Sequence, residues 1–332
     1  MFNYEKYKNK IKENENKART EIKKKYVQIY KGELYKKISP LQLEYNRTKL
    51  NIPKIIVFDL DETLGSFGDI ESLWSGINQY MYLSTNIEGL LQKEFNELMH
   101  IYPEFLRTGI IELLSFIYNK KREGDCFRIY IYTNNQCPSA WTYLISNYMS
   151  SVVIDLNASN DNKHIMNPTM KVFDHIVCSF KINNQIIETM RTTQDKTYTD
   201  FIRCTMISKN VEICFIDNTY FSKMTNDKVY YIQPRSYYHG LPYKLILERL
   251  FNSHIFTSIT NTPHFLEFIY DWFKTKGSRS FDRVKTEDER EIDIIVQQKI
   301  WYHVKEFFLM TTRNVHTKKI RSQLGRFTRK KR

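Results

Sequence analysis

The order of apolar and polar stretches along the chain predicts strands that are separated by helices. Four short runs, rich in Ile, Val, Phe and Tyr, have the length and composition of buried strands. They are residues 54–60 (KIIVFDL), 128–133 (RIYIYT), 211–217 (VEICFID) and 228–234 (KVYYIQP). Helical patterns lie between them, including one that opens near Gly109 and one with Pro138 in its first turn. The pattern indicates an α/β fold with a mainly parallel sheet and helices on both faces.

Both ends of the chain have helical patterns without strands. Residues 5–37 fit a helix with one weak apolar face, formed by Ile22, Tyr26, Ile29, Tyr30 and Leu34. After residue 243 only helices are expected, and the longest spans residues 288–311. It carries one apolar stripe, made of Ile292, Val296, Ile300, Val304 and Phe308. The chain therefore divides into a basic helical extension (1–50), a central domain (51–250), a helical region (251–317) and a basic tail (318–332).

Positive charge is concentrated at the two ends. The 332 residues carry a net charge of +13, yet residues 1–50 and residues 318–332 each contribute +8, so the middle is slightly negative. Basic ends suit acidic partners such as nucleic acid, a phosphoprotein or a membrane surface, and they are also typical of solubilising tails. The C-terminal tail is interpreted as a polyanion-recruiting segment or a nuclear address.

Composition narrows the class of protein further. Hydrophobic residues make up 42% of the chain, which is enough for a sizeable core. No apolar stretch approaches the roughly 18 residues that span a bilayer, so membrane insertion is not expected. The N-terminus lacks the apolar heart of a signal peptide, and a soluble intracellular protein of the nucleus or cytoplasm is predicted. Five scattered cysteines without a CxxC pair argue against a disulfide scaffold or a zinc ribbon. Abundant Lys, Asn, Ile and Tyr indicate an A/T-rich coding genome, such as that of a large DNA virus.

Polar side chains follow three of the predicted strands where each strand ends. The sets are Asp59, Asp61 and Thr63, then Thr133 and Asn134, then Asp217 and Asn218. Ligands of an open parallel sheet bind beyond the carboxyl ends of its strands, and side chains two residues apart point the same way. Several carboxylates in one pocket repel one another unless a cation lies between them. Oxygen ligands select a hard cation, so Mg²⁺ is the expected cofactor.

These residues resemble the motifs of the haloacid dehalogenase superfamily. DLDETL resembles its first motif, DxDxT, and Glu62 and Leu64 resemble the branch of phosphatases that act on the C-terminal domain of RNA polymerase II, with their small-phosphatase relatives. FLRTGIIELLSFI is similar to the family's LRPGxxEFL helix, with Thr108 where proline is usual. IYIYTNN, DKTYTDFIRC and CFIDNTY resemble the second, third and fourth motifs. The resemblance covers roughly residues 50–250.

The resemblance implies a role for each residue. Asp59 is the nucleophile, Asp61 the general acid and base, and Thr63 belongs to the same catalytic motif. Thr133, Asn134 and Lys196 bind the phosphate, and the metal ligands are Asp59, Asp61, Asp217 and Asn218. A carboxylate can take a phosphoryl group onto itself as an acyl phosphate. We expect a haloacid-dehalogenase-like, Rossmann-type three-layer fold and a Mg²⁺-dependent phosphatase, acting on phosphoserine or phosphothreonine proteins such as the RNA polymerase II C-terminal domain.

The sequence departs from the family pattern at several places. Thr219 and Tyr220 replace the usual Ser-Pro after the fourth motif. Residues 157–193 contain extra length where the family carries an insert beside the active site. The gap between Lys196 and Asp217 is longer than usual, so Lys171, Lys181 and Lys209 are other candidates for the motif III lysine. The BRCT domain of the larger polymerase-tail phosphatases is not evident in the C-terminal third.

The sequence is also compatible with other functions. A phosphatase of this type could act on nucleic-acid ends or small phosphate esters, although the nucleic-acid enzymes usually have Gly where Glu62 stands. No GxxxxGK[ST] loop of a linked kinase occurs. A non-catalytic scaffold or a basic nucleic-acid-binding protein on the same fold are further alternatives. We interpret His239 as a structural loop histidine, and Arg191 and Arg235 as surface salt-bridge residues rather than phosphate ligands. The sequence predicts no oligomeric state.

Overall fold

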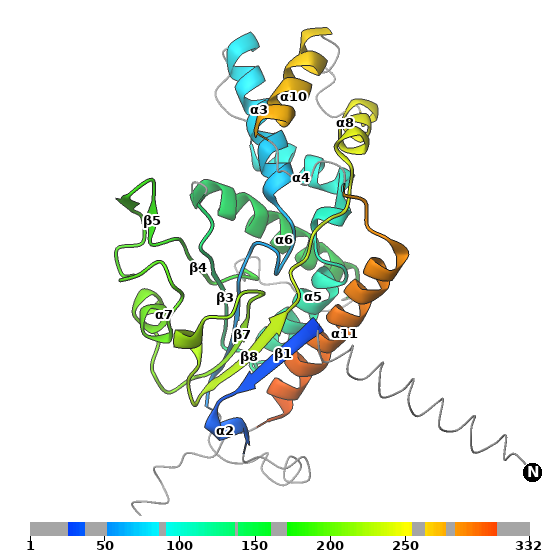
Figure 1. Ribbon diagram of the computed structural model, residues 1–332. Helices are drawn as coiled ribbons and strands as arrows, with labels where there is room; N and C mark the ends of the chain where they lie inside the picture. The colour runs from blue at the N-terminus through cyan, green and yellow to red at the C-terminus, as the bar shows by residue number, and fades with distance from the viewer. Residues whose placement is uncertain are drawn as a thin grey trace, which may run out of the picture.

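The central feature of the fold is a six-stranded, mostly parallel sheet flanked by helices (Figure 1). The computed structural model describes residues 26–36, 52–85, 91–136, 139–160, 171–253, 263–276 and 283–310. Pro138, most of the N-terminal extension and the basic tail lie outside these residues. The predicted α/β class with a mainly parallel sheet is confirmed.

Helices lie between most of the predicted strands, but only a short 3-10 turn separates the last two, and the strands His175–Val177, Lys181–Ile182 and Gln185–Ile186 were not predicted. The strands of the large sheet are β1 (Val27–Lys31), β2 (Lys54–Phe58), β3 (Arg128–Tyr132), β4 (His175–Val177), β7 (Glu212–Ile216) and β8 (Val229–Pro234), and a small hairpin is formed by β5 (Lys181–Ile182) and β6 (Gln185–Ile186). The helices are α2 (Glu33–Lys36), α3 (Gly68–Thr85), α4 (Gln92–Ile101), α5 (Ile110–Arg122), α6 (Ser139–Asn160), α7 (Tyr198–Thr205), α8 (Tyr243–Asn252), α10 (Pro263–Lys276) and α11 (Glu287–Leu309). Two short 3-10 turns are η2 (Pro103–Phe105) and η3 (Ser222–Met224).

The topology of the sheet creates a binding crevice. The strand order is β1-β8-β7-β2-β3-β4, in which every neighbouring pair is parallel except β1 with β8. The chain runs from β2 outward through β3 to β4 and then returns to the other side of β2 to form β7 and β8. The order therefore reverses at β2, and ligands of such sheets bind at this reversal, outside the carboxyl ends of the strands.

The alternation of side chains in β2 divides the interior into two cores. Ile56 and Phe58 face a large core that also contains side chains of α3, α4, α5, α6, α8, α10 and α11. Ile55 and Val57 face a smaller core on the opposite face, where α7 supplies Phe201. Because every residue of β2 is buried, the strand reads as a continuous apolar run instead of an alternating one.

Helix α11 confirms the apolar stripe in the C-terminal part of the chain. Val296, Ile300 and Val304 are buried against the large core, and the helix runs alongside β1 and β8 in Figure 1. Its first residues are capped by Thr286, whose hydroxyl accepts from the backbone N–H of Glu289. The helix begins one residue before the predicted range and ends two residues earlier.

The helix predicted over residues 5–37 is wrong at Val27–Lys31, which form strand β1. These residues pair antiparallel with β8, from Val27 opposite Pro234 to Lys31 opposite Tyr230. The spacing of apolar residues favours a helix locally, but pairing with the edge of β8 favours a strand. That edge is present only in the folded protein. The strand joins the sheet of the central domain, although the sequence pattern assigned it to the extension. The four-part division of the chain stays a prediction.

The expectations about membrane-spanning segments and disulfides can be examined in the described residues. Within them, every helix is too short or too polar to traverse a bilayer. Four of the five cysteines fall in this part of the chain, and all four are free thiols: Cys126, Cys178, Cys204 and Cys214.

Candidate active site

The register of the sheet brings Asp59 and Asp217 side by side. Phe58 at the end of β2 pairs with Ile216 at the end of β7, so the two aspartates follow on adjacent strands. The backbone N–H of Asp59 continues the ladder by donating to Ile216 O at 2.9 Å. Neighbouring strands lie about 4.8 Å apart, which places two buried carboxylates next to each other. They lie at the strand-order reversal, where the sheet topology predicts a ligand.

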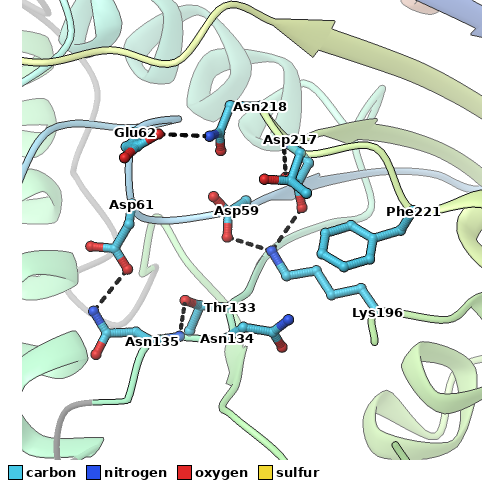
Figure 2. A pocket seen from close by; sticks show the side chains of 11 residues that line it. Asp59, Asp61, Glu62, Thr133, Asn134, Asn135, Lys196, Asp217, Asn218 and Phe221 are labelled. Atoms are coloured by element: carbon cyan, nitrogen blue, oxygen red, sulfur yellow. Dashed lines mark hydrogen bonds and ion pairs between the residues drawn. The ribbon is translucent and has the colours of Figure 1, made fainter. Parts of the chain in front are cut away.

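Lys196 lies between these carboxylates. Its Nζ donates to Asp217 Oδ2 at 2.7 Å and to Asp59 Oδ1 (Figure 2). The next residue, Thr197, caps α7 by accepting from the N–H of Asp200, and this fixes the backbone from which the lysine extends. Burial lowers the pKa of Lys196, but Asp217 and Asp59 outweigh that effect, so its pKa is raised and it stays an ammonium ion.

The other candidate lysines of the third motif lie elsewhere. Lys171, Lys181 and Lys209 are exposed, and none of them lines the pocket around Asp59. The geometry therefore favours Lys196.

Thr63 connects the segments that follow β2 and β7 beside the pocket. Its hydroxyl oxygen lies 3.0 Å from Asp59 Oδ2 and 2.9 Å from Asn218 Oδ1, and it accepts the backbone N–H of Asn218 at 3.0 Å. A hydroxyl has one proton, so it can donate to only one of these two oxygens. Thr63 is almost completely buried, and its contacts orient the carboxylate of Asp59.

The turn that follows β2 is held by a buried arginine. Glu62 adopts a left-handed backbone conformation with φ of 59°, which is unfavourable for a residue other than glycine. Arg107, just before α5, donates from Nε to Thr63 O at 2.6 Å and from Nη2 to Glu62 O at 2.5 Å. Arg107 is 1% exposed, and the two bonds hold the strained turn in place.

Asp61 is separated from the Asp59 cluster and has its own partner. Asn135 Nδ2 donates to Asp61 Oδ2 at 2.8 Å, and the backbone N–H of Asn135 donates to Thr133 Oγ1 at 2.9 Å. Burial raises the pKa of Asp61 to about 6; the bond from Asn135 opposes the rise and the charge of Asp59 adds to it. The carboxyl group is therefore protonated in a substantial fraction of molecules near pH 6, as an acid catalyst requires.

The loop after β3 is braced by Arg191. This arginine is 2% exposed, and its guanidinium donates to Asn134 Oδ1 at 2.7 Å, to Cys178 O at 2.7 Å and to Thr133 O at 3.1 Å. The interpretation of Arg191 as a surface salt-bridge residue is wrong, because its buried guanidinium donates to five carbonyl-type oxygens, the other two being Gln194 O and Asp195 O. Sequence alone does not reveal this role, since the partners come from distant segments.

The pocket carries more negative than positive charge. Its volume is about 300 Å³, and its walls are formed by Asp59, Asp61, Glu62, Thr133, Asn134, Asn135, Lys196, Asp217, Asn218, Thr219 and Phe221. Four of these are acids and one is a lysine. Burial raises the pKa of Asp217 above its usual range, and the neighbouring Asp59 adds to the rise although Lys196 opposes it. An additional cation would relieve this excess of negative charge.

The donor set fits Mg²⁺ in type and charge. Among the described residues, no three His, Cys, Asp or Glu side chains converge into a ready-made metal cage. A magnesium ion is commonly held by one or two carboxylates together with water and substrate phosphate, so a full cage of side chains is not needed. Asp59 and Asp217 are the pair that meets this requirement, whereas the side chain of Asp61 is directed to Asn135.

All eight residues predicted from the sequence lie in this one place. Seven line the pocket, and Thr63 is buried and contacts two of them, Asp59 and Asn218. Asn135 and Phe221 also line the pocket and were not predicted. The sequence carries a weak signal for Asn135, which repeats the polar residue type of Asn134, and none for Phe221.

Two further residues have structural roles outside the pocket. His239 Nε2 bonds Asp69 Oδ2 at 2.8 Å and its Nδ1 accepts from the N–H of Leu241, which confirms the structural interpretation. Arg235 stacks over Tyr26, with 5.6 Å from the guanidinium carbon to the ring centroid.

Comparisons with protein-family models, with curated proteins and with solved structures found no match.

Proposed function

We propose that this chain is a Mg²⁺-dependent phosphatase of the haloacid dehalogenase type that forms an aspartyl phosphate on Asp59. The observation that carries the proposal is the buried cluster of Asp59, Lys196 and Asp217 at the carboxyl ends of β2 and β7. Supporting it are the four motif resemblances in their expected order, all of which contribute residues to one pocket.

In the first half of the proposed reaction, a carboxylate oxygen of Asp59 attacks the phosphorus and the bond from phosphorus to the ester oxygen breaks. Asp61 donates its proton to the departing oxygen, so the leaving group departs as an alcohol. The raised pKa of Asp61, about 6, supports this role, because an acid must carry its proton at the working pH. Lys196 and the hydroxyl of Thr133 hold the phosphoryl oxygens, and positive potential favours the charge that spreads over them.

In the second half, Asp61 acts as a base. Its carboxylate removes a proton from a water molecule, the water oxygen bonds to phosphorus, and the bond from phosphorus to Asp59 breaks. Inorganic phosphate leaves and Asp59 returns to a free carboxylate. A bound Mg²⁺, held by Asp59 and Asp217, would neutralise charge on the phosphoryl oxygens.

The substrate class rests on the resemblance alone. Phosphoserine or phosphothreonine proteins, such as the RNA polymerase II C-terminal domain, are the substrates that the branch resemblance implies. The non-catalytic alternative receives no support from the pocket, because the acids, the lysine and the threonine that the chemistry needs are all retained within it. We further propose that the basic termini recruit an acidic partner.

A panel of substrates tests the proposal. Phosphoserine peptides, 3′-phosphorylated oligonucleotides and small phosphate esters are assayed in parallel, with Mg²⁺ and with a chelator. We expect chelator-sensitive phosphate release that is highest on the peptides and inhibited by beryllofluoride. Release that Mg²⁺ does not influence, or that persists in Asp59→Asn, would remove the proposed mechanism.

A further inference from the structure

The pocket has one apolar wall, and it is a single aromatic side chain. Of the described residues that line the pocket, Phe221 alone is apolar, and the rest are acids, amides, two threonines and one lysine. Figure 2 shows its ring beside Lys196, across the pocket from Asp61 and Glu62. The ring centroid lies 5.4 Å from Lys196 Nζ. The two walls therefore differ in kind, one charged and one aromatic.

Phe221 is held in this position by its backbone. Its N–H donates to the hydroxyl oxygen of Tyr231 on β8 at 3.1 Å, and that hydroxyl donates to Thr219 O at 2.5 Å. Tyr220, which lies between Thr219 and Phe221 in the sequence, stacks its ring on that of Tyr231 with the centroids 5.8 Å apart. On the other side, Met224 donates its N–H to Phe221 O at 3.0 Å and is fully buried. The backbone of Phe221 is thus anchored to β8 and to the turn that follows Phe221.

Phe221 lies close to the position that the proposed function gives to the phosphoryl group. A phosphoryl group in contact with Asp59 and Lys196 would lie near Phe221, because the ring centroid is 5.4 Å from the Lys196 Nζ. A volume of about 300 Å³ exceeds that of a phosphoryl group and leaves room for the first part of the leaving group. Any apolar part of that group gains by removing Phe221 from water, whereas the opposite wall offers it only polar partners.

We infer that Phe221 is a specificity-determining residue that selects phosphomonoesters with a flat or branched apolar group close to the ester oxygen. This inference rests on the proposed function, since it concerns the leaving group of the same site. The shared chemistry has two sources in proteins: the ring of a phosphotyrosine, or an apolar side chain beside a phosphoserine.

A binding experiment tests the inference independently of turnover. Phenylphosphonate and methylphosphonate share the phosphonate group and differ in the apolar part. We expect the wild-type protein with Mg²⁺ to bind phenylphosphonate about tenfold more tightly, and Phe221→Ala to lose most of this preference while it binds methylphosphonate unchanged. Phe127→Ala is the matched control, because Phe127 is an exposed phenylalanine at the amino-terminal end of β3, away from the pocket.

Turnover then separates the two sources. Kinetics on phosphotyrosine, and on phosphoserine peptides with Leu or Gly beside the phosphoserine, show which leaving group Phe221→Ala affects selectively. Equal affinity of the wild-type protein for the two phosphonates, or the same loss of affinity for both in Phe221→Ala, would overturn the inference. The proposed function fails on a different result, namely hydrolysis that Asp59→Asn leaves intact.

Discussion

Strands β2 and β7 carry a buried lysine–carboxylate cluster at each end, and the two clusters differ in charge balance. At the amino end, Lys54 Nζ lies 2.5 Å from Glu212 Oε2 and donates to Phe307 O of α11 at 2.8 Å, with the Phe307 ring 4.3 Å away. One ammonium faces one carboxylate, and α11 covers the pair. At the carboxyl end, one ammonium faces two carboxylates in an open pocket. A balanced, covered pair anchors a helix, whereas an unbalanced, accessible one leaves charge for a ligand to neutralise.

The largest expected effect is the loss of turnover at the carboxyl end. Asp59→Asn keeps the shape of the side chain and removes the proposed nucleophile, so we expect phosphate release to fall at least about a thousandfold. The fold should be retained, because Lys196 keeps Asp217 as a partner. Steady-state kinetics with circular dichroism on the same sample measure both properties. A variant with normal turnover would mean that another group attacks phosphorus.

Neutralising one carboxylate at each end should separate the clusters by stability. Glu212→Gln leaves Lys54 buried without a countercharge, which costs about 3 kcal/mol of unfolding free energy. In metal-free protein, Asp217→Asn reduces repulsion with Asp59, so we expect a change within about 1 kcal/mol, in either direction. Urea unfolding curves of the two variants give the comparison. If Glu212→Gln and Asp217→Asn lower the unfolding free energy equally, the two clusters do not differ in charge balance as described.

Magnesium should stabilise the protein more at neutral pH than at acidic pH. The pKa values of Asp61, about 6, and of Asp217, also raised, lie above those of unfolded aspartate, so the folded state binds more protons between about pH 4 and pH 7. The contribution of these groups to stability is therefore present at low pH and is lost as pH rises through their folded pKa values. In the proposed site Mg²⁺ is held by Asp59 and Asp217, so it competes with the proton of Asp217.

Thermal unfolding with and without Mg²⁺ measures this effect. We expect a shift in melting temperature of several degrees at pH 7.5 and a clearly smaller one at pH 5. The Asp217→Asn variant is the control, in which the difference between the two pH values should shrink. An equal shift at both pH values would mean that Mg²⁺ does not bind to these carboxylates.

The smallest effect is expected at Asn135. Asn135→Ala removes the bond to Asp61 that lowers the pKa of this carboxyl group, so the pH above which turnover declines should move upward by about half a unit. Turnover at the optimum should fall only a few-fold, since Asp61 itself remains. A pH–rate profile at saturating Mg²⁺ reports the change. If the pH above which turnover falls is unchanged in the variant, a group other than Asp61 causes that fall.

The sequence predicts the acids of the site better than their supports. Asp59, Lys196 and Asp217 belong to local motifs, and the parallel register of β2 and β7 then brings the aspartates together. Arg107 and Arg191 donate to backbone carbonyls of remote segments. Every residue has such a carbonyl, so the sequence does not indicate which ones will be their partners. The side-chain direction of a residue beyond a strand end, such as Asn135, is set by the turn and not by strand alternation.

The error at β1 has the same cause on a larger scale. Tyr26, Ile29 and Tyr30 have the spacing of a helix face, and local preference alone supports that prediction. The strand forms because β8 presents backbone groups that need partners about 200 residues away in sequence, from Val27 opposite Pro234 onward. Strands whose partners are already internal, such as β2, were predicted correctly because their apolar runs are sufficient evidence.

The position of β1 also matters for shortening the protein. A chain that starts at Asn51, where the recognisable motifs begin, would leave one side of β8 with unsatisfied N–H and C=O groups. Such an unpaired edge strand pairs with strands of other molecules. The shortened protein should therefore self-associate, even though its pocket residues are complete.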